Sequence, residues 1–231
     1  MNIESSRGRK RLPTQILLAM AVLLVPQALS GQTGRPLPNQ DFQGWTDFDA
    51  THPLRENTDF HLSTGLRYGD DQGHLMYRRI ATGVVFHWHK FLTLEPYYQH
   101  SVSDLISGSI SYENRLAMAA TVEVPWKRWE ISDHNVGERR FLQNQRLWRY
   151  RNRVEVRRPT RIVRKQLSVF AWDEIYYSPS IHSWYLNRVA LGAGRKLGRR
   201  ISTDIYYVHQ SSGYAHPGNL NALGLTIKAR F

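Results

Sequence analysis

The sequence contains no cysteine, so the folded chain has no disulfide framework and no cysteine-based zinc site. A lipoprotein is excluded for the same reason. The chain also lacks a long apolar segment, because its longest unbroken run is residues 16–25. A membrane-spanning helix needs about 20 such residues, so no transmembrane helix is predicted. A glycine-rich phosphate loop is absent as well.

The N-terminus has the three parts of a secretory signal. Four basic residues within 7–11 precede the apolar run, and Ala28-Leu29-Ser30 then offers small residues for cleavage. We therefore predict that residues 1–30 are a cleaved signal peptide. Their removal takes away four basic residues and one acidic residue and leaves a net charge of +9. An exported chain does not meet nucleic acid, so acidic lipopolysaccharide or an anion path is the expected complement of this charge.

The rest of the chain alternates with a period of two residues, and helical periodicity is nearly absent. Residues 31–42 contain Pro36 and Pro38 and are predicted to be a mobile leader. Residues 43–231 are predicted to form one domain. The predicted strands are 43–50, 59–69, 75–89, 91–103, 112–124, 128–141, 147–158, 166–177, 184–196, 199–211 and 221–231. Short links alternate with longer polar ones, as in transmembrane β-barrels.

These runs number eleven, whereas bacterial single-chain barrels have even numbers of strands. We therefore expect that the runs near the N-terminus contain one strand more or one strand fewer than these boundaries give. We predict 12 strands, with 10 as the second choice.

The last predicted strand has one apolar and one polar face. Leu223, Leu225, Ile227 and Phe231 share the first face, and Lys228 and Arg230 share the second. An apolar outer stripe that ends in an aromatic residue resembles the closing strand of Gram-negative outer-membrane barrels. Phe231 is thus a predicted membrane-insertion signature, which implies the barrel-assembly machinery as a partner.

Charged residues of the predicted strands indicate which face is the lumen. An arginine near the membrane midplane on the lipid face costs about 2–4 kcal/mol, so the arginine-rich face of residues 147–158 has to point inward. Asn152 then faces outward, against the pattern. The predicted lumen-lining residues are Arg149, Arg151, Arg153, Glu155, Arg157, Glu130, His134, Glu138, Arg188, Lys228 and Arg230. Cross-strand pairs of these acids and arginines would either fill and rigidify the barrel or form a charged constriction.

Several motifs in this order resemble the DUF2490 family. They are WEISDHNVGERRF (129–141), WRYRNRVEVRRP (148–159), Trp172-Asp173-Glu174, Leu186-Asn187-Arg188 and the final residues 223–231. The resemblance implies an outer-membrane β-barrel of uncharacterised function and supplies no activity.

A lipid-modifying enzyme is the alternative function. A serine nucleophile needs an imidazole base and an orienting acid within hydrogen-bond reach. The neighbours available are His100 with Ser101 or Ser103, and His209 with Ser211 or Ser212, oriented by Asp204 or Asp104. Neither pair lies in an esterase motif, and no metal site or cofactor is predicted.

The sequence thus predicts an all-β, single antiparallel transmembrane β-barrel in the bacterial outer membrane, in contact with its lipids and lipopolysaccharide. The leading function is a narrow, anion-preferring pore or a structural barrel. A lipid A or phospholipid acyl hydrolase is the second hypothesis, and a soluble periplasmic β-binding module is the third.

Overall fold

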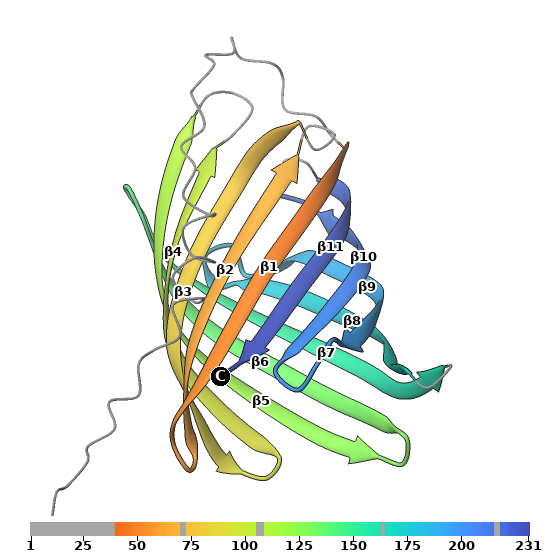
Figure 1. The fold of residues 1–231 in the computed structure, drawn as a ribbon. Coiled ribbons are helices and arrows are strands. Elements are labelled where there is room, and N and C mark those ends of the chain that lie inside the picture. The colour runs from red at the N-terminus through yellow and green to blue at the C-terminus, as the bar shows by residue number, and fades with distance from the viewer. Residues whose placement is uncertain (1–39, 70–72, 105–108, 163–164, 215–217) are drawn as a thin grey trace, which may run out of the picture. The chain divides into compact units, whose positions relative to one another are not determined.

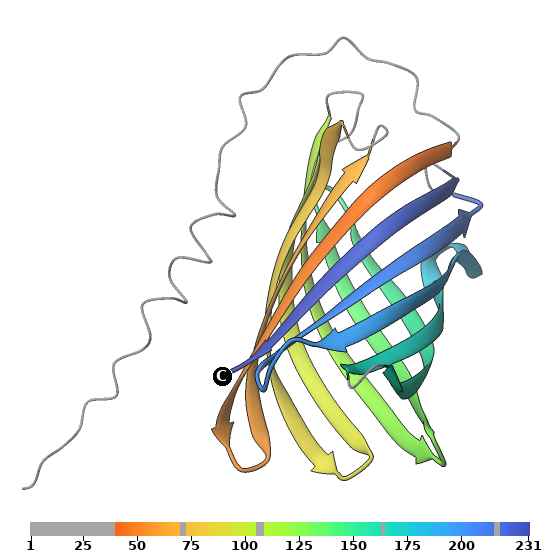
Figure 2. The same ribbon diagram turned by 45° about the vertical axis from the view of Figure 1, so that its right-hand side comes forward.

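The computed structural model describes residues 40–69, 73–104, 109–162, 165–214 and 218–231. The predicted signal peptide and most of the predicted leader lie outside the described residues. Within them the chain forms a closed antiparallel barrel, apart from one parallel pair between its first and last strands (Figures 1 and 2). Its strands are β1 (Gln40–Arg55), β2 (Thr58–Gly69), β3 (His74–His89), β4 (Leu92–Asp104), β5 (Ile110–Trp126), β6 (Trp129–Leu142), β7 (Arg146–Ile162), β8 (Lys165–Ser178), β9 (Ser183–Lys196), β10 (Ile201–Ser212) and β11 (Asn219–Arg230).

The strand count corrects the prediction of 12. The described residues form eleven strands, and each strand pairs with its neighbours in sequence order. An odd number of alternating strands makes the first and last run in the same direction. β1 and β11 accordingly close the barrel as a parallel pair, from Gln40 opposite Asn219 to Thr51 opposite Arg230.

The first strand begins earlier than predicted. β1 starts at Gln40, so the last three residues assigned to the leader belong to the barrel. The Gln43 amide donates to Asp41 at 2.7 Å, and the Trp45 indole donates to Gln43 at 2.8 Å. These bonds link successive inward-facing side chains at the start of β1.

The two ends of the barrel differ in their connections. At one end, here called the short-turn end, strands are joined by two or four residues, such as 127–128 between β5 and β6. Lys127 adopts a left-handed conformation with φ 58° in that turn. At the other end, here called the loop end, three to six residues join the strands, among them the short 3₁₀ helix η2 (Pro179–Ile181). No helix among the described residues is long and apolar enough to cross a membrane.

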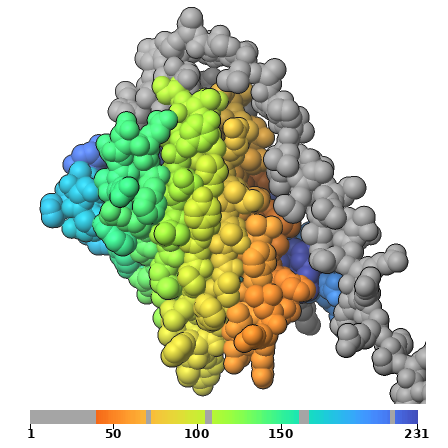
Figure 3. All heavy atoms as spheres, turned by 90° about the vertical axis from the view of Figure 1, so that its left-hand side faces the viewer, coloured from red at the N-terminus to blue at the C-terminus, as the bar shows by residue number. Residues whose placement is uncertain are grey.

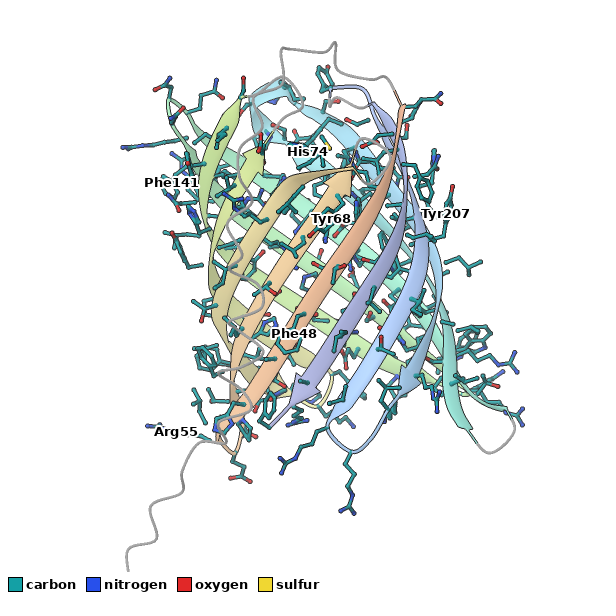
Figure 4. All side chains as sticks on the ribbon, turned by 45° about the horizontal axis from the view of Figure 1, so that its top comes forward. Phe48, Arg55, Tyr68, His74, Phe141 and Tyr207 are labelled. Carbon is teal, nitrogen blue, oxygen red and sulfur yellow. The ribbon has the colours of Figure 1, made fainter. Side chains whose placement is uncertain are left out.

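The burial pattern is inverted relative to a soluble protein. Large apolar side chains lie exposed on the outer wall, including Leu116, Leu191 and Ile205, which are 56%, 68% and 60% exposed. In Figure 4, Phe141 and Tyr207 point away from the barrel on opposite sides, and in Figure 3 outer side chains pack in continuous bands along the strands. Charged side chains such as Glu138, Glu174 and Asp204 are buried inside instead. Such a wall needs an apolar solvent.

An apolar cluster covers one side of the lumen. Trp45, Phe170, Trp172 and Tyr206 form it together with small and aliphatic residues of β9, β10 and β11. The ring of Tyr206 lies over Gly224, where an added Cβ would be 2.1 Å from its Cζ atom. Glycine at this position therefore makes room for the aromatic side chain inside the barrel.

Candidate functional site: a charged lumen

Two fully buried glutamates organise the arginines of β7. Glu138 of β6 is 1% exposed, and Glu174 of β8 is 0% exposed. Since β6 and β8 both pair with β7, their inward side chains lie on either side of the Arg149, Arg151 and Arg153 row. The alternation of β7 thus places three guanidinium groups between two carboxylates.

Each β7 arginine bonds to at least one of these glutamates. Arg149 donates its Nε to Glu138 Oε2 at 2.6 Å. Arg151 bridges the two acids, with Nε 3.1 Å from Glu138 Oε1 and Nη1 3.1 Å from Glu174 Oε1. Arg153 donates Nε and Nη2 to Glu174 Oε1 at 3.2 and 3.0 Å. A buried carboxylate needs partners of this kind, so the row is held rigidly.

Some bonds cross the lumen rather than follow the wall. Arg151 Nη2 donates to the Tyr97 hydroxyl of β4 at 3.0 Å, although β5 and β6 separate β4 from β7 around the barrel. Arg188 of β9 lies over the Trp45 ring of β1 at 4.9 Å. Crossing side chains of this length divide the interior of a small barrel and keep any passage narrow.

The buried acids lie behind the arginines, and the cations face the open space. The main cavity has a volume of about 550 Å³. Among the described residues that line it, eight are basic and four are acidic, and Glu138 and Glu174 are not among them. The basic residues are Arg67, Arg79, Arg115, Arg149, Arg151, Arg153, Arg188 and Lys228. The surface that a solute would meet is therefore cationic.

The predicted lumen residues all occupy inward positions in the strands. Arg149, Arg151, Arg153, Glu155, Arg188 and Lys228 line the main cavity, and Glu130 and Arg157 line a second cavity. His134 lies opposite Arg153 and its Nδ1 is 2.7 Å from the Thr121 hydroxyl. Arg230 has its Nη2 3.5 Å from Asp59. The backbone N–H of Phe231 donates to the Thr51 carbonyl at 3.0 Å, which extends the β1–β11 contact.

The sequence interpretation missed part of the lumen. Asp47 of β1 binds Arg67 and Arg79, each at 2.9 Å, and Glu113 of β5 binds two more arginines. The same alternation marks these inward positions in β1, β2, β3 and β5. Arg153 pairs with Glu174, which was not among the predicted lumen residues. Asp173 and Glu174 are adjacent, so one of them faces inward in either register of the strand, and the sequence alone does not say which.

The outward position of Asn152 is explained by its neighbours on the outer wall. Its amide donates to Asp133 at 2.5 Å and to Asn135 at 3.1 Å, and the Tyr150 hydroxyl donates to Asn135 at 2.5 Å. Mutual hydrogen bonding lowers the cost of polar groups on this face.

Two of the groups considered for catalysis, Ser101 and Asp204, point away from the histidines proposed as their partners. His100 shares the outer face with Asn114, to which its Nδ1 lies at 2.8 Å, whereas Ser101 is 1% exposed and faces inward. His209 and Ser211 share the outer face, but Asp204 points inward to Arg157 and Lys228. No cluster of three or more metal-ligating side chains occurs among the described residues.

The fold and its charged lumen define a closed β-barrel of the kind found in bacterial outer membranes. The chain belongs to the DUF2490 family, described as "Protein of unknown function (DUF2490)", whose sequence pattern matches residues 42–221. No curated protein matches the chain.

Solved structures with a similar fold include two porins and one further barrel protein. The KdgM porin has a TM-score of 0.43 at 9% identity over 74% of this chain and 89% of its own. LpxR from Salmonella typhimurium has 0.45 at 8% identity over 78% and 84%, respectively. An anion-selective porin from Comamonas acidovorans has 0.36 at 13% identity over 73% and 57%. Likeness at this level concerns the barrel architecture and assigns no activity.

Proposed function

We propose that this protein is an outer-membrane barrel whose lumen is a narrow passage for small anions. The observation that carries the proposal is the charge of the main cavity, where eight basic and four acidic described residues line the open space. Rings of arginine and lysine are the usual means by which pores favour anions. A field of one sign in a low-dielectric wall also concentrates counter-ions inside it.

The exposed apolar wall supports the membrane location over a soluble binding module. A water-soluble barrel would gather its apolar side chains inside, whereas here Leu191 and Ile205 are more than half exposed and Glu174 is buried. On this proposal the partners are outer-membrane lipids, lipopolysaccharide and the barrel-assembly machinery, which reads the final strand and Phe231.

Single-channel recording in a planar bilayer with a salt gradient tests the pore. The variant to compare is Arg153→Gln, because Arg153 lines the cavity and its side chain is 34% exposed. Glu174 keeps Arg151 and Arg188 as partners in this variant. We expect discrete conductance steps with anion selectivity in the wild type and a reversal potential closer to zero in Arg153→Gln.

Arg139→Gln is the matched control. Arg139 is on the neighbouring strand β6, opposite Trp148 on the outer wall, and lies over the ring of that residue at 5.0 Å. Its loss should leave the reversal potential unchanged. Electrical silence from protein that is shown to be folded would overturn the pore and favour a structural barrel filled by its ion pairs.

A further inference from the structure

The lumen contains a second cavity, of about 540 Å³, toward the short-turn end. It is lined by residues of β6 to β11, including Ser168, Gly194 and Ser202. Among the described residues, the two that line both this cavity and the main one are Asp204 and Lys228. A solute moving between the two cavities would therefore pass this pair.

Asp204 holds two cations at the junction. Arg157 donates Nη1 to Oδ1 at 3.1 Å and Nη2 to Oδ2 at 3.0 Å, which is a two-bond fork. Lys228 donates Nζ to Oδ2 at 3.0 Å. Arg157 of β7 reaches Asp204 of β10 over the inner faces of β8 and β9, which lie between these two strands. The three charged groups thus lie together where the two cavities meet.

The wall is shaped to accept this cluster. A Cβ at Gly194 would be 2.1 Å from Asp204 Oδ1 and 2.8 Å from Arg157 Nη1, so a side chain there would displace the pair. The Ser168 hydroxyl accepts a further hydrogen bond from Arg157 Nη1 at 2.9 Å. Lys228 is different, since half of its side chain is exposed to the open space. Lys228 is therefore accessible from the cavity, whereas Arg157 and Asp204 are mostly buried against the wall.

We infer that Asp204 is a latch that sets the rate and selectivity of anion passage, an inference that rests on the proposed pore. Its carboxylate is bound to Arg157 and Lys228, which are the two cations that an incoming oxyanion would bind. A small carboxylate or phosphate in the main cavity meets Lys228 first and advances by replacing Asp204 as the partner of Lys228 and Arg157. The fork of Arg157 fits the two oxygens of such a group.

The test is Asp204→Asn in the mature, full-length protein, recorded in a planar bilayer with a salt gradient. The substitution keeps the shape of the side chain and removes its charge. We expect conductance to rise by about twofold or more and the reversal potential to become more anion-selective, since a charge that repels anions is removed from the junction of the two cavities.

Glu155→Gln is the matched control. Glu155 also binds Arg157, with Oε1 2.8 Å from its Nε, but it lines the main cavity and not the second one. Its loss should change conductance less than Asp204→Asn. Equal effects of the two variants would overturn the latch, because the position at the junction would then have no special weight.

A chemical restoration separates charge from folding. The chain has no cysteine, so Asp204→Cys provides a single reactive thiol. A negatively charged methanethiosulfonate should return the conductance toward that of the wild type, and a positively charged one should increase anion selectivity further. Reagents of both signs acting alike would contradict the latch.

Failure of the latch and failure of the pore are distinguishable. If Arg153→Gln shifts selectivity but Asp204→Asn behaves as wild type, the latch is wrong and the pore stands. If folded wild type and all variants are silent, the pore itself is overturned.

Discussion

At the scale of single residues, the lumen depends on carboxylates that have no contact with solvent. Glu174 accepts hydrogen bonds from Arg151, Arg153 and the Tyr176 hydroxyl, the last at 2.6 Å. Removing one partner of such a cluster leaves uncompensated charge in a low-dielectric site. The adjacent Asp173 is exposed on the outer wall, so two neighbouring acids have very different environments.

We predict that Glu174→Gln lowers the free energy of unfolding by about 3–5 kcal/mol, because three arginines lose their shared counter-charge. Asp173→Asn should change the free energy of unfolding by less than about 0.5 kcal/mol. The Asn187 amide donates to Asp173 Oδ1 on the outer wall, and an asparagine at position 173 still offers it an oxygen acceptor. Urea unfolding in detergent or lipid, followed by tryptophan fluorescence, measures both. A Glu174→Gln protein as stable as the wild type would show that the arginines rely on other partners.

At the scale of strands, close approach between neighbours requires glycine at certain inward positions. A Cβ at Gly192 of β9 would lie 2.7 Å from the Ile205 carbonyl oxygen and 2.4 Å from the Phe170 ring. A backbone atom cannot move aside as a flexible side chain can. By contrast, nothing lies within 4 Å of a Cβ at Gly137 of β6.

The expected result is that Gly192→Ala destabilises the barrel by about 1–3 kcal/mol through overpacking. Gly137→Ala, the control on another strand, should be neutral or slightly stabilising. The comparison can be made from the temperature at which the folded band is lost on an unboiled gel. Equal shifts of this temperature in the two variants would contradict the prediction, because they would mean that the side chains around Phe170 rearrange to accept the added methyl group.

At the scale of the whole barrel, closure by a parallel pair distinguishes this chain from barrels with even strand numbers. The β1–β11 register places Thr46 opposite Leu225 and Phe48 opposite Ile227. In a parallel pair, moving two residues forward on β1 also moves two residues forward on β11, as these two residue pairs do. In an antiparallel pair the partner residue number would fall as the first one rises, so Thr46–Leu225 and Phe48–Ile227 could not both be opposite one another.

Two double-cysteine variants test this closure, since the chain has no native cysteine. Thr46→Cys/Leu225→Cys and Phe48→Cys/Ile227→Cys should each form a disulfide on mild oxidation, because directly paired Cα atoms fall within about 4.4–6.8 Å. Gel mobility without reductant detects the cross-link. Thr46→Cys/Ile227→Cys serves as the out-of-register control, and cross-linking of only one in-register pair would contradict parallel closure.

The path from sequence to structure was most direct where one face carried charge and the other did not. The alternation in residues 147–158 placed Arg149, Arg151 and Arg153 inward, since the alternative exposes three cations to lipid. The alternation in residues 166–177 places Asp173 and Glu174 on opposite faces but does not say which of the two points inward. The prediction of 12 strands is wrong because it assumes an even number, whereas the described residues form eleven strands that match the eleven alternating runs of the sequence.

The sequence by itself determined the barrel class and the inward face of most strands, because side chains alternate with a fixed period and lipid excludes charge. Which charged side chains pair inside the barrel was decided only by the tertiary structure. Whether Arg153 meets Glu155 or Glu174, and whether Arg157 reaches Asp204 of β10, depends on strand register and on closure between β1 and β11. Strand register and barrel closure place residues side by side that are far apart in the chain, and the local alternation of the sequence does not determine either of them.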